Sequence, residues 1–151
     1  MQEYVICVAL SREGAVLIEK KRPPQQAGMW NFPGGKLETF TMEDGTTKKE
    51  SVASCARREF LEETGVDIDS WINVGVIMGP TYNVSIMATL DEASSRAETT
   101  TDEEIFIQDT YAFNEACDFQ DTVQNVRTVF NFVNDVWRNE PDTRIVLSYA
   151  S

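Results

Sequence analysis

The feature that most limits how this chain can fold is a set of glutamates with helical spacing. Glu59, Glu62 and Glu63 stand at positions i, i+3 and i+4, so a helix over residues 51–64 places all three on one face. Like charges at these spacings destabilise an isolated helix, and a cation would offset them. Mg²⁺ is the natural candidate because carboxylate oxygens are its ligands. The alternative is a solvated acidic face.

The ends and the inner face of this helix also follow from the sequence. Ser51 is a suitable N-cap, and Gly65 stands where a C′ glycine ends a helix. Apolar positions recur with helical spacing and predict the face that packs on the core: Val52, Cys55, Ala56 and Phe60. We expect Leu61 to point toward the core as well.

A pair of glycines precedes this helix in the run Phe32–Glu38. We expect Gly34 and Gly35 to form a tight turn, which lets a backbone carbonyl approach a metal and lets phosphates come close. The alternative is an ordinary turn without a ligand. Residues 39–49 follow, contain Asp44-Gly45, and indicate an exposed turn or flap.

The rest of the chain predicts strands and a second helix. The strand candidates are Tyr4–Leu10, Ala15–Glu19, Trp30–Phe32, Trp71–Met78, Tyr82–Leu90, Ile105–Phe113 and Arg144–Tyr149. The first two form a hairpin around the four-residue loop 11–14, and residues 91–102 read as a loop. Apolar residues at three- and four-residue steps predict an amphipathic helix over 121–138. We therefore expect one α+β domain over residues 1–151, with α/β/α layers and a mixed sheet.

The absence of one residue type narrows the chemistry. The sequence contains no histidine, which excludes histidine-based triads, general bases and metal ligands. Acid–base chemistry must then rest mainly on carboxylates, Lys, Tyr or Cys. The three cysteines, Cys7, Cys55 and Cys117, have no repeated spacing, so we expect buried, reduced thiols and neither disulfides nor a zinc site.

The net charge of −12, from 13 basic and 25 acidic residues, bears on partners. An acidic surface repels a nucleic-acid backbone, so duplex nucleic acid is not an expected partner. A small phosphate ligand is compatible with this charge if metal ions bridge the two. No signal-peptide-like segment and no stretch apolar enough for a membrane span are evident, so we expect a cytoplasmic protein that binds no membrane. A homodimer is compatible with all of this.

Residues 58–66, Arg58-Glu59-Phe60-Leu61-Glu62-Glu63-Thr64-Gly65-Val66, resemble the second half of the Nudix hydrolase box. That box reads Gly, five residues, Glu, seven residues, Arg-Glu, an apolar residue, any residue, Glu-Glu, any residue, Gly, apolar. Glu50 stands seven residues before Arg58, as the box requires. Between Gly35 and Glu50, however, the chain has 14 residues where the box has five, which predicts a loop insertion around residues 40–48. Gly45 is the alternative anchor, but it leaves four residues and loses the glycine pair.

This resemblance implies a mixed sheet between helices and Mg²⁺-dependent attack of water on a diphosphate-linked nucleoside, with Mn²⁺ as a substitute metal. It implies metal ligands at Glu59, Glu62, Glu63 and the Gly34 carbonyl, with Glu50 as a further or more distant ligand. Arg58 matches an orienting residue. A downstream glutamate is also implied, for which we choose Glu104 over Glu103; the alternative is an exposed acidic loop. The general base is then Glu59 or Glu104.

The implied substrate is less sharply defined. Residues 21–36 resemble the nucleoside-triphosphate branch of the family, including its phage and bacterial members, and imply substrate contacts from Arg22, Gly35 and Lys36. Tyr82 and Pro80 stand near positions used by branches that cleave ADP-ribose or dinucleoside polyphosphates; the alternative is a core Tyr and a turn Pro. Asn125 matches a residue that reads the purine edge; the alternative is a solvent-facing polar residue.

We therefore favour hydrolysis of a nucleoside triphosphate, intact or oxidised, to a monophosphate and pyrophosphate. The first alternative is hydrolysis of ADP-ribose or a dinucleoside polyphosphate. The second is a non-catalytic domain that senses nucleotides. Removal of mRNA caps would need a basic RNA path, which an acidic chain of this size hardly offers.

Overall fold

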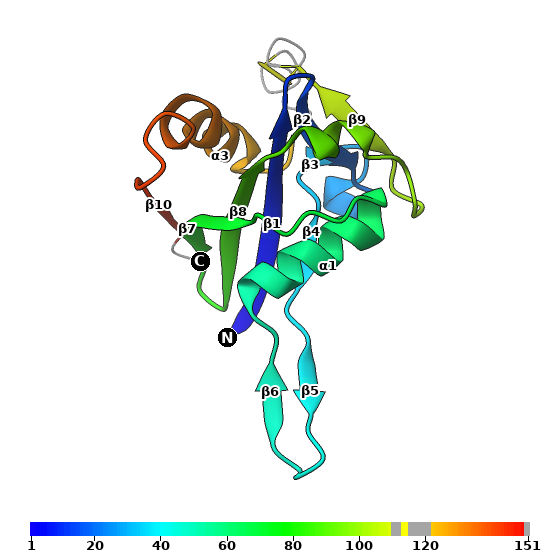
Figure 1. Ribbon diagram of the computed structural model, residues 1–151, viewed down its shortest axis with the longest axis vertical. Coiled ribbons are helices and arrows are strands. Elements are labelled where there is room, and N and C mark those ends of the chain that lie inside the picture. Colours follow the sequence, from blue (N-terminus) through cyan, green and yellow to red (C-terminus); the bar gives the residue numbers. More distant parts are fainter. Residues whose placement is uncertain (110–112, 115–121, 150–151) are drawn as a thin grey trace.

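A computed structural model describes residues 1–109, 113–114 and 122–149. A mixed β-sheet forms the middle layer, and helices lie on both of its faces (Figure 1). The long helix α1 (Val52–Thr64) covers one face, and α3 (Val126–Asn131) covers the other. The expected α+β architecture with a mixed sheet is confirmed.

Eight strands form the main sheet in the described part of the chain. They are β1 (Gln2–Ser11), β2 (Gly14–Glu19), β3 (Trp30–Asn31), β4 (Gly34–Lys36), β7 (Ile72–Met78), β8 (Tyr82–Leu90), β9 (Ile105–Gln108) and β10 (Ile145–Ser148). The order is β10-β7-β8-β1-β2-β3, with β4 paired to β1 and β9 paired to β2. The pairs β1–β8 and β10–β7 are parallel, and the others are antiparallel.

Strand β1 changes partner along its length on one side. Near its start it pairs with β4, where Val5 lies opposite Gly35 and Ile6 lies opposite Gly34. Near its end it pairs with β2, where Ser11 lies opposite Gly14. The pairing with β4 holds the glycine pair close to α1, where the Glu59 side chain lies against Gly35.

The two faces of the sheet carry two hydrophobic clusters, because successive side chains of a strand point to opposite faces. Val5, Cys7 and Ala9 of β1 pack with the α1 side, whereas Val8 and Leu10 pack with the α3 side. On the α1 side the rings of Phe60 and Trp71 meet edge to face at 5.2 Å. On the α3 side Phe113 stacks on Phe130 at 3.9 Å. The sheet is thus buried between two apolar layers.

The predicted ends of α1 are confirmed. The Ser51 hydroxyl accepts a hydrogen bond from the Ser54 N–H at 3.1 Å, and Gly65 ends the helix with a left-handed φ of 77°. The expectation for Leu61 is wrong, since that side chain is 42% exposed. Successive helical residues are about 100° apart, so the residue after the buried Phe60 turns away from the core.

Several smaller predictions are corrected by hydrogen bonding. Ser11 and Gly14 extend the β1–β2 ladder, so the first hairpin has a two-residue turn and not a four-residue loop. Gly34 and Gly35 are not a turn but lie in β4. Strand β9 ends at Gln108, and the remainder of the strand expected there lies partly outside the described residues.

The last helix is also shorter and less regular than predicted. Its described part begins at Val126, and after Asn131 it continues as a π-helix over Phe132–Trp137. Short 3₁₀ segments interrupt the expected loops at Pro24–Gln26 and Glu92–Arg96. Cys7 and Cys55 are buried and free, as expected, whereas Cys117 lies outside the described residues.

The segment before α1 forms a hairpin of β5 (Thr39–Thr41) and β6 (Thr47–Lys49) that projects from the body (Figure 1). Its turn is closed by the Gly45 N–H, which donates to the Met42 carbonyl at 2.9 Å. The Asp44 carboxylate accepts hydrogen bonds from Thr46, which lowers the pKa of Asp44. All residues of both strands are exposed, as the expected flap requires.

At its base the hairpin touches the residues that precede α1. The Glu38 N–H donates to a carboxylate oxygen of Glu50 at 3.0 Å, and the Glu50 N–H donates to the Glu38 carbonyl at 2.9 Å. We expect that shortening residues 40–48 to a tight turn changes KM or substrate preference by about threefold or more, because such loops act as lids. Metal dependence should be unchanged. Unaltered steady-state kinetics on every substrate of a nucleotide panel would mean that the hairpin contributes neither to substrate binding nor to substrate choice.

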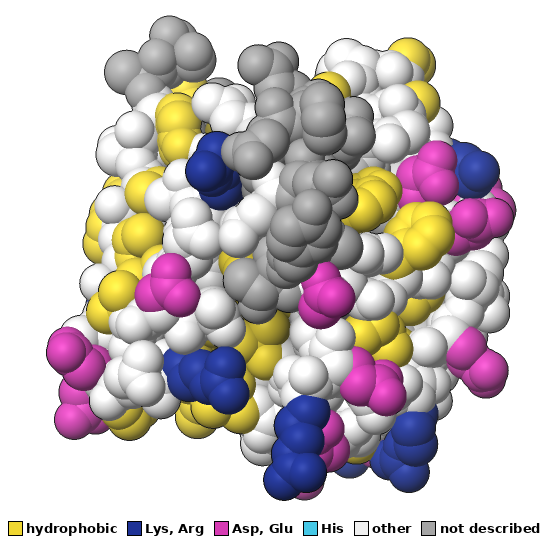
Figure 2. All heavy atoms as spheres, turned by 90° about the horizontal axis from the view of Figure 1, so that it is seen from above, with side chains coloured by type: hydrophobic (Ala, Val, Ile, Leu, Met, Phe, Trp, Pro, Cys, Tyr) yellow, Lys and Arg dark blue, Asp and Glu magenta, His cyan; other side chains and the backbone are white. Residues whose placement is uncertain are grey.

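Charged side chains of both signs are spread over the face shown in Figure 2, and the described residues of that face form no continuous basic patch. This distribution agrees with the acidic composition. The helices in the described part of the chain lack the length and apolar character that a membrane span requires.

Candidate active site

The three glutamates of α1 lie in different environments. The Glu62 side chain is 56% exposed, whereas that of Glu59 is 15% exposed. Glu63 is the most unusual: one carboxylate oxygen accepts a hydrogen bond from the Gly34 N–H at 3.4 Å, and the other is buried and has no hydrogen-bond partner. Burial, followed by the charge of Glu59, raises the pKa of Glu63 to about 8. A buried carboxylate in this state calls for a proton or a cation.

Glu59 packs directly against the backbone of β4. A Cβ atom on Gly35 would lie 2.3 Å from a carboxylate oxygen of Glu59, and one on Gly34 would lie 2.1 Å from the Val5 carbonyl oxygen. Gly34 is therefore required for the close approach of β4 to β1, and Gly35 leaves room for the Glu59 carboxylate as it lies in this structure. Burial is also the largest cause that raises the pKa of Glu59.

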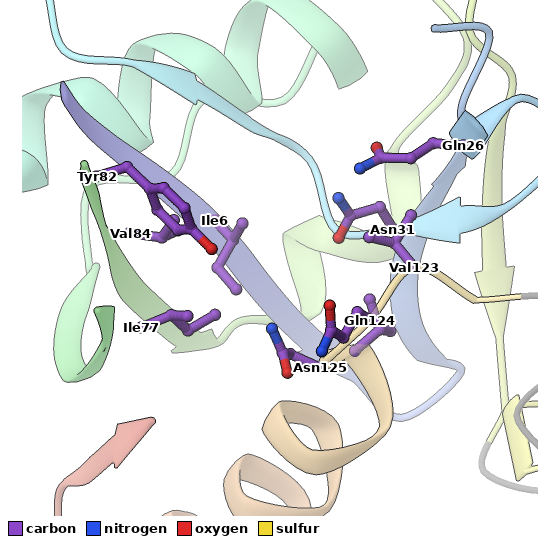
Figure 3. A pocket seen from close by; sticks show the side chains of 10 residues that line it. Ile6, Gln26, Asn31, Ile77, Tyr82, Val84, Val123, Gln124 and Asn125 are labelled. Carbon is purple, nitrogen blue, oxygen red and sulfur yellow. The ribbon is translucent and has the colours of Figure 1, made fainter. Parts of the chain in front are cut away.

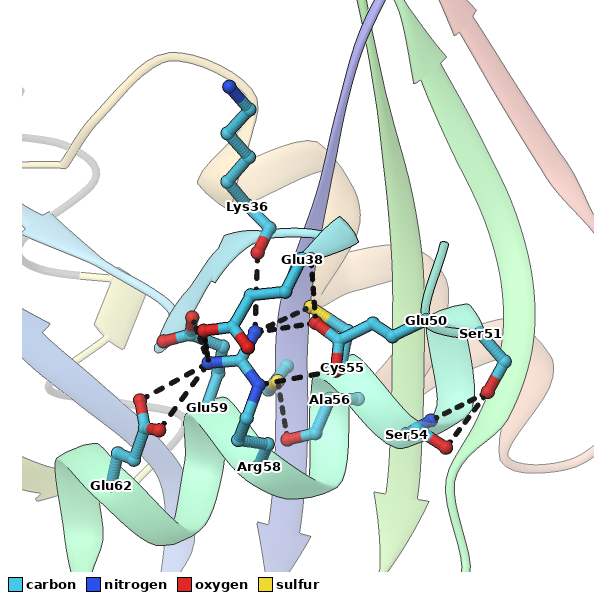
Figure 4. A network of polar contacts seen from close by, with 11 residues as sticks. Lys36, Glu38, Glu50, Ser51, Ser54, Cys55, Ala56, Arg58, Glu59 and Glu62 are labelled. Carbon is cyan, nitrogen blue, oxygen red and sulfur yellow. Dashed lines mark hydrogen bonds and ion pairs between the residues drawn. The ribbon is translucent and has the colours of Figure 1, made fainter. Parts of the chain in front are cut away.

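Arg58 lies among the carboxylates and binds several of them (Figure 4). Its guanidinium donates to both oxygens of Glu50, at 2.6 and 3.2 Å, which lowers the pKa of Glu50. It also donates to Glu59 at 3.0 Å and to Glu62 at 3.3 Å. These contacts suit the orienting role expected for Arg58. They also engage Glu50, whose side chain is only 6% exposed.

The carboxylate side chains of α1 are of the chemical type that binds a divalent cation. Among the described residues, however, they do not converge into a complete metal site. No three Asp, Glu or Cys side chains among them converge closely enough to hold an ion. Glu63 nevertheless offers a buried oxygen without a partner, and Glu59 and Glu62 lie on the same helix face. Hard carboxylate oxygens are the donor set that Mg²⁺ and Mn²⁺ prefer.

The downstream glutamate that faces this cluster is Glu103. Its carboxylate accepts a hydrogen bond from the Lys21 N–H at 2.9 Å and lies 3.5 Å from the Lys20 ammonium. Its charge contributes to the raised pKa of Glu63, which reflects their proximity. Glu104 is exposed, and its backbone carbonyl pairs with the Glu19 N–H. The structure thus brings the Glu103 carboxylate close to Glu63 and leaves that of Glu104 exposed, as expected where alternate residues point to opposite sides.

A two-part cleft extends from the glycine pair to the start of α3. One part, of about 500 Å³, is lined by Gly34, Gly35, Lys36 and Lys20 among others. The other, of about 260 Å³, is lined by Tyr82, Gln124 and Asn125 among others (Figure 3). The parts adjoin, since they share four lining residues: Ile6, Gln26, Asn31 and Val84. Charged and backbone groups thus line one end, and amides line the other.

The candidate substrate residues are distributed unevenly along this cleft. Gly35 and Lys36 line the first part, and Tyr82 and Asn125 line the second. Arg22 instead forms a paired ion bridge with Asp102, at 3.1 to 3.2 Å, and does not line either part. Sequence reasoning did not single out three amide residues of the second part, Gln26, Asn31 and Gln124. Only the sheet topology brings these separate segments together.

Fold and site together define a class of protein: a mixed sheet between helices, with a glutamate-rich helix beside one end of a two-part cleft. The chain belongs to the NUDIX domain family, whose sequence model matches residues 1–128. The resemblance of the glutamate motif is thereby confirmed.

Relatives and solved structures agree with this family. An oxidized purine nucleoside triphosphate hydrolase from Danio rerio is 36% identical over 70 residues, which are 46% of this chain and 39% of that protein. A putative 8-oxo-dGTP diphosphatase 2 from Mycobacterium tuberculosis is 33% identical over 45% of this chain and 43% of its own length. The chain thus spans less than half the length of these curated relatives. The mutator MutT protein from Bacillus halodurans shares the fold, with a TM-score of 0.65 and 16% identity over 99% of this chain and 90% of that one.

The raised pKa of Glu63 predicts how metal and pH affect stability. A carboxyl group whose pKa rises from 4.5 to about 8 on folding stabilises the metal-free protein below pH 4.5, and this contribution is lost as pH rises through 8. We expect the melting temperature in EDTA to fall between pH 6 and pH 8.5. Millimolar Mg²⁺ at matched ionic strength should raise it by at least about 3 °C at the higher pH.

Differential scanning calorimetry in both buffers measures this effect. Because Mg²⁺ binds weakly without nucleotide, the scan should be repeated with a nonhydrolysable triphosphate analogue. A melting temperature that Mg²⁺ leaves unchanged at pH 8.5 under both conditions would contradict a metal site at Glu63.

Proposed function

We propose that this chain is a divalent-metal-dependent pyrophosphohydrolase of small nucleotides. Its favoured substrate is a purine nucleoside triphosphate, intact or oxidised, which it converts to the monophosphate and pyrophosphate. The observation that carries the proposal is the partnerless oxygen of Glu63, next to the glycine pair that lines the charged end of the cleft. The names of the two curated relatives support the triphosphate as substrate.

The cleft matches the two ends of such a substrate. Lys20 and Lys36 line the part beside the glutamates and suit the phosphate chain. The amides and apolar side chains of the second part suit a base, because amides both donate and accept hydrogen bonds. Glu59, Glu62 and Glu63 would hold the metal, with Glu50 kept in place by Arg58.

In the reaction, a water oxygen forms a bond to phosphorus, and the bridging P–O bond breaks toward the leaving phosphate group. When bound, a divalent ion supplies charge neutralisation on the diphosphate and lowers the pKa of the attacking water. A carboxylate takes the proton of that water, and Glu103 and Glu59 are the candidates. Arg58 holds Glu59 in a fixed position by its 3.0 Å hydrogen bond.

A nucleotide panel tests this proposal. It should include the deoxynucleoside triphosphates, an oxidised purine triphosphate, ADP-ribose and a dinucleoside polyphosphate, each assayed with Mg²⁺, with Mn²⁺ and with EDTA. We expect metal-dependent turnover with the highest kcat/KM on a purine triphosphate. If ADP-ribose or a dinucleoside polyphosphate is turned over with the highest kcat/KM, that compound and not a triphosphate is the favoured substrate. Nucleotide binding without turnover of any substrate would indicate a sensing domain and overturn it.

A further inference from the structure

The hairpin of β5 and β6 has one apolar face that nothing in the described part of the chain covers. Phe40 and Met42 stand two residues apart, so they lie on the same face of the ribbon, and they are 44% and 46% exposed. The other face carries threonines and Lys49. An isolated two-stranded hairpin is only marginally stable in water, so a ribbon that projects with an exposed apolar face (Figure 1) indicates a partner.

A groove lies in front of this apolar face. It measures about 560 Å³, and Ser51 and Ser54 at the start of α1 line it on one side. Phe40, Met42 and Lys48 line it from the hairpin, and Lys48 lies directly opposite Phe40 in the ladder. The same hairpin thus presents apolar side chains for insertion and helps to form a groove that receives apolar side chains. Such a surface is self-complementary, as the interface of a symmetric dimer must be.

The charges of the hairpin favour a second copy of the same chain as its partner. Glu43 and Asp44 lie at the tip, and Lys48 and Lys49 lie toward the base, so residues 39–49 carry two negative and two positive charges and no net charge. The whole chain carries a net charge of −12. Two copies of the chain therefore repel each other in general, but their hairpins do not add to this repulsion.

Two of these charges are available for contacts with another copy. The side chains of Glu43 and Lys48 form no ion pair or hydrogen bond with the residues that the structure describes. When two hairpins lie antiparallel, the tip of one meets the base of the other. This arrangement brings Glu43 of each copy to Lys48 of the other, and it places Phe40 and Met42 of both copies near the two-fold axis.

We propose that this chain forms a symmetric dimer with a second copy of itself through antiparallel β5–β6 hairpins, apolar face against apolar face. One hairpin offers an area at the low end of protein interfaces, so we expect a dimer dissociation constant on the order of 10–100 µM. Neither a nucleotide nor a metal takes part in this contact, so the dimer goes beyond the proposed function and does not depend on it.

Sedimentation velocity of the full chain tests the dimer over a concentration series from about 1 to 500 µM, which brackets the expected dissociation constant. We expect the average mass to rise toward that of two chains. Phe40→Ser combined with Met42→Ser should keep the chain monomeric throughout the series. Its melting temperature should stay within about 2 °C of the wild type, because both side chains are exposed. Val146→Ser removes an apolar side chain that is 63% exposed in β10, and it should leave dimerisation unchanged.

Two charge reversals test the antiparallel arrangement. Glu43→Lys and Lys48→Glu should each weaken dimerisation by about tenfold, because each places two like-charged pairs in the interface. In an equimolar mixture of the two variants, a dimer of one copy of each has two oppositely charged pairs again. That mixture should therefore dimerise as tightly as the wild type.

A chain that stays monomeric at every concentration would overturn the proposal and leave the apolar face to a macromolecule of another kind. A dimer that survives Phe40→Ser with Met42→Ser, or that Val146→Ser weakens to the same extent, would overturn it as well. If the two charge-reversal variants do not dimerise with each other more tightly than each does alone, the antiparallel pairing of the hairpins is wrong.

Discussion

Glu63→Gln should lower kcat by at least about 100-fold while the protein remains folded. The change removes the charge that would bind the metal but keeps the size of the side chain. The metal-free variant should be as stable as the wild type or more so above pH 7, because it no longer has a buried carboxylate without a partner. Loss of activity without loss of stability is the signature of a residue kept for function.

Steady-state kinetics and a melting curve of the same sample measure both effects. Glu62→Gln should lower kcat to a similar extent, although its more exposed side chain predicts little change in melting temperature. Glu140→Gln makes the same charge change at an exposed position outside the cleft and serves as the matched control. Turnover near that of the wild type in a folded Glu63→Gln or Glu62→Gln variant would remove these residues from the metal site.

Glu103→Gln should lower kcat by about 100-fold, whereas Glu104→Gln should lower it by less than about threefold. Glu103 lies near Glu63 and is held by Lys20 and the Lys21 N–H, so its carboxylate can accept a proton from a water molecule bound beside the glutamates of α1. Glu104 is exposed. The two variants differ by one position and carry the same chemical change, so each controls for the other.

The pH profile of kcat separates a base from a residue that only positions the loop. Loss of a general base removes the acidic limb of the profile, whereas loss of a positioning contact lowers kcat at every pH. If Glu104→Gln is the more damaging of the two, Glu104 is the base candidate that the sequence first indicated. If both variants retain wild-type kcat, Glu59 becomes the candidate base.

The glutamate-bearing face of α1 and the ends of this helix could be predicted from the sequence because their signals are local. Helical spacing places Glu59, Glu62 and Glu63 on one face, and the caps at Ser51 and Gly65 depend only on neighbouring residues. Most strands were found for the same reason, since alternation and β-branched residues are local features. The exact ends of the strands could not be predicted as well, because they depend on pairing with distant strands. The extension of β1 to Ser11 is an example.

The parts that the structure corrected, or that the sequence left open, depend on distant contacts. The glycine pair was expected in a turn, but the pairing of β4 with β1 decides its conformation. The choice between Glu103 and Glu104 depends on how one loop enters β9. The amide end of the cleft joins segments near residues 26, 31 and 124, and no sequence signal connects Asn125 with Tyr149, whose hydroxyl donates a hydrogen bond to it.

Hydrolysis of the preferred triphosphate in water labelled with heavy oxygen, with products resolved by mass spectrometry, tests the central claim most directly. The account predicts Mg²⁺-dependent formation of a monophosphate and pyrophosphate, with one labelled oxygen in one of these two products and none in orthophosphate. Chelation of the metal should stop the reaction. Labelled orthophosphate together with a nucleoside diphosphate, or equal rates in Mg²⁺ and EDTA, would contradict a metal-dependent pyrophosphohydrolase.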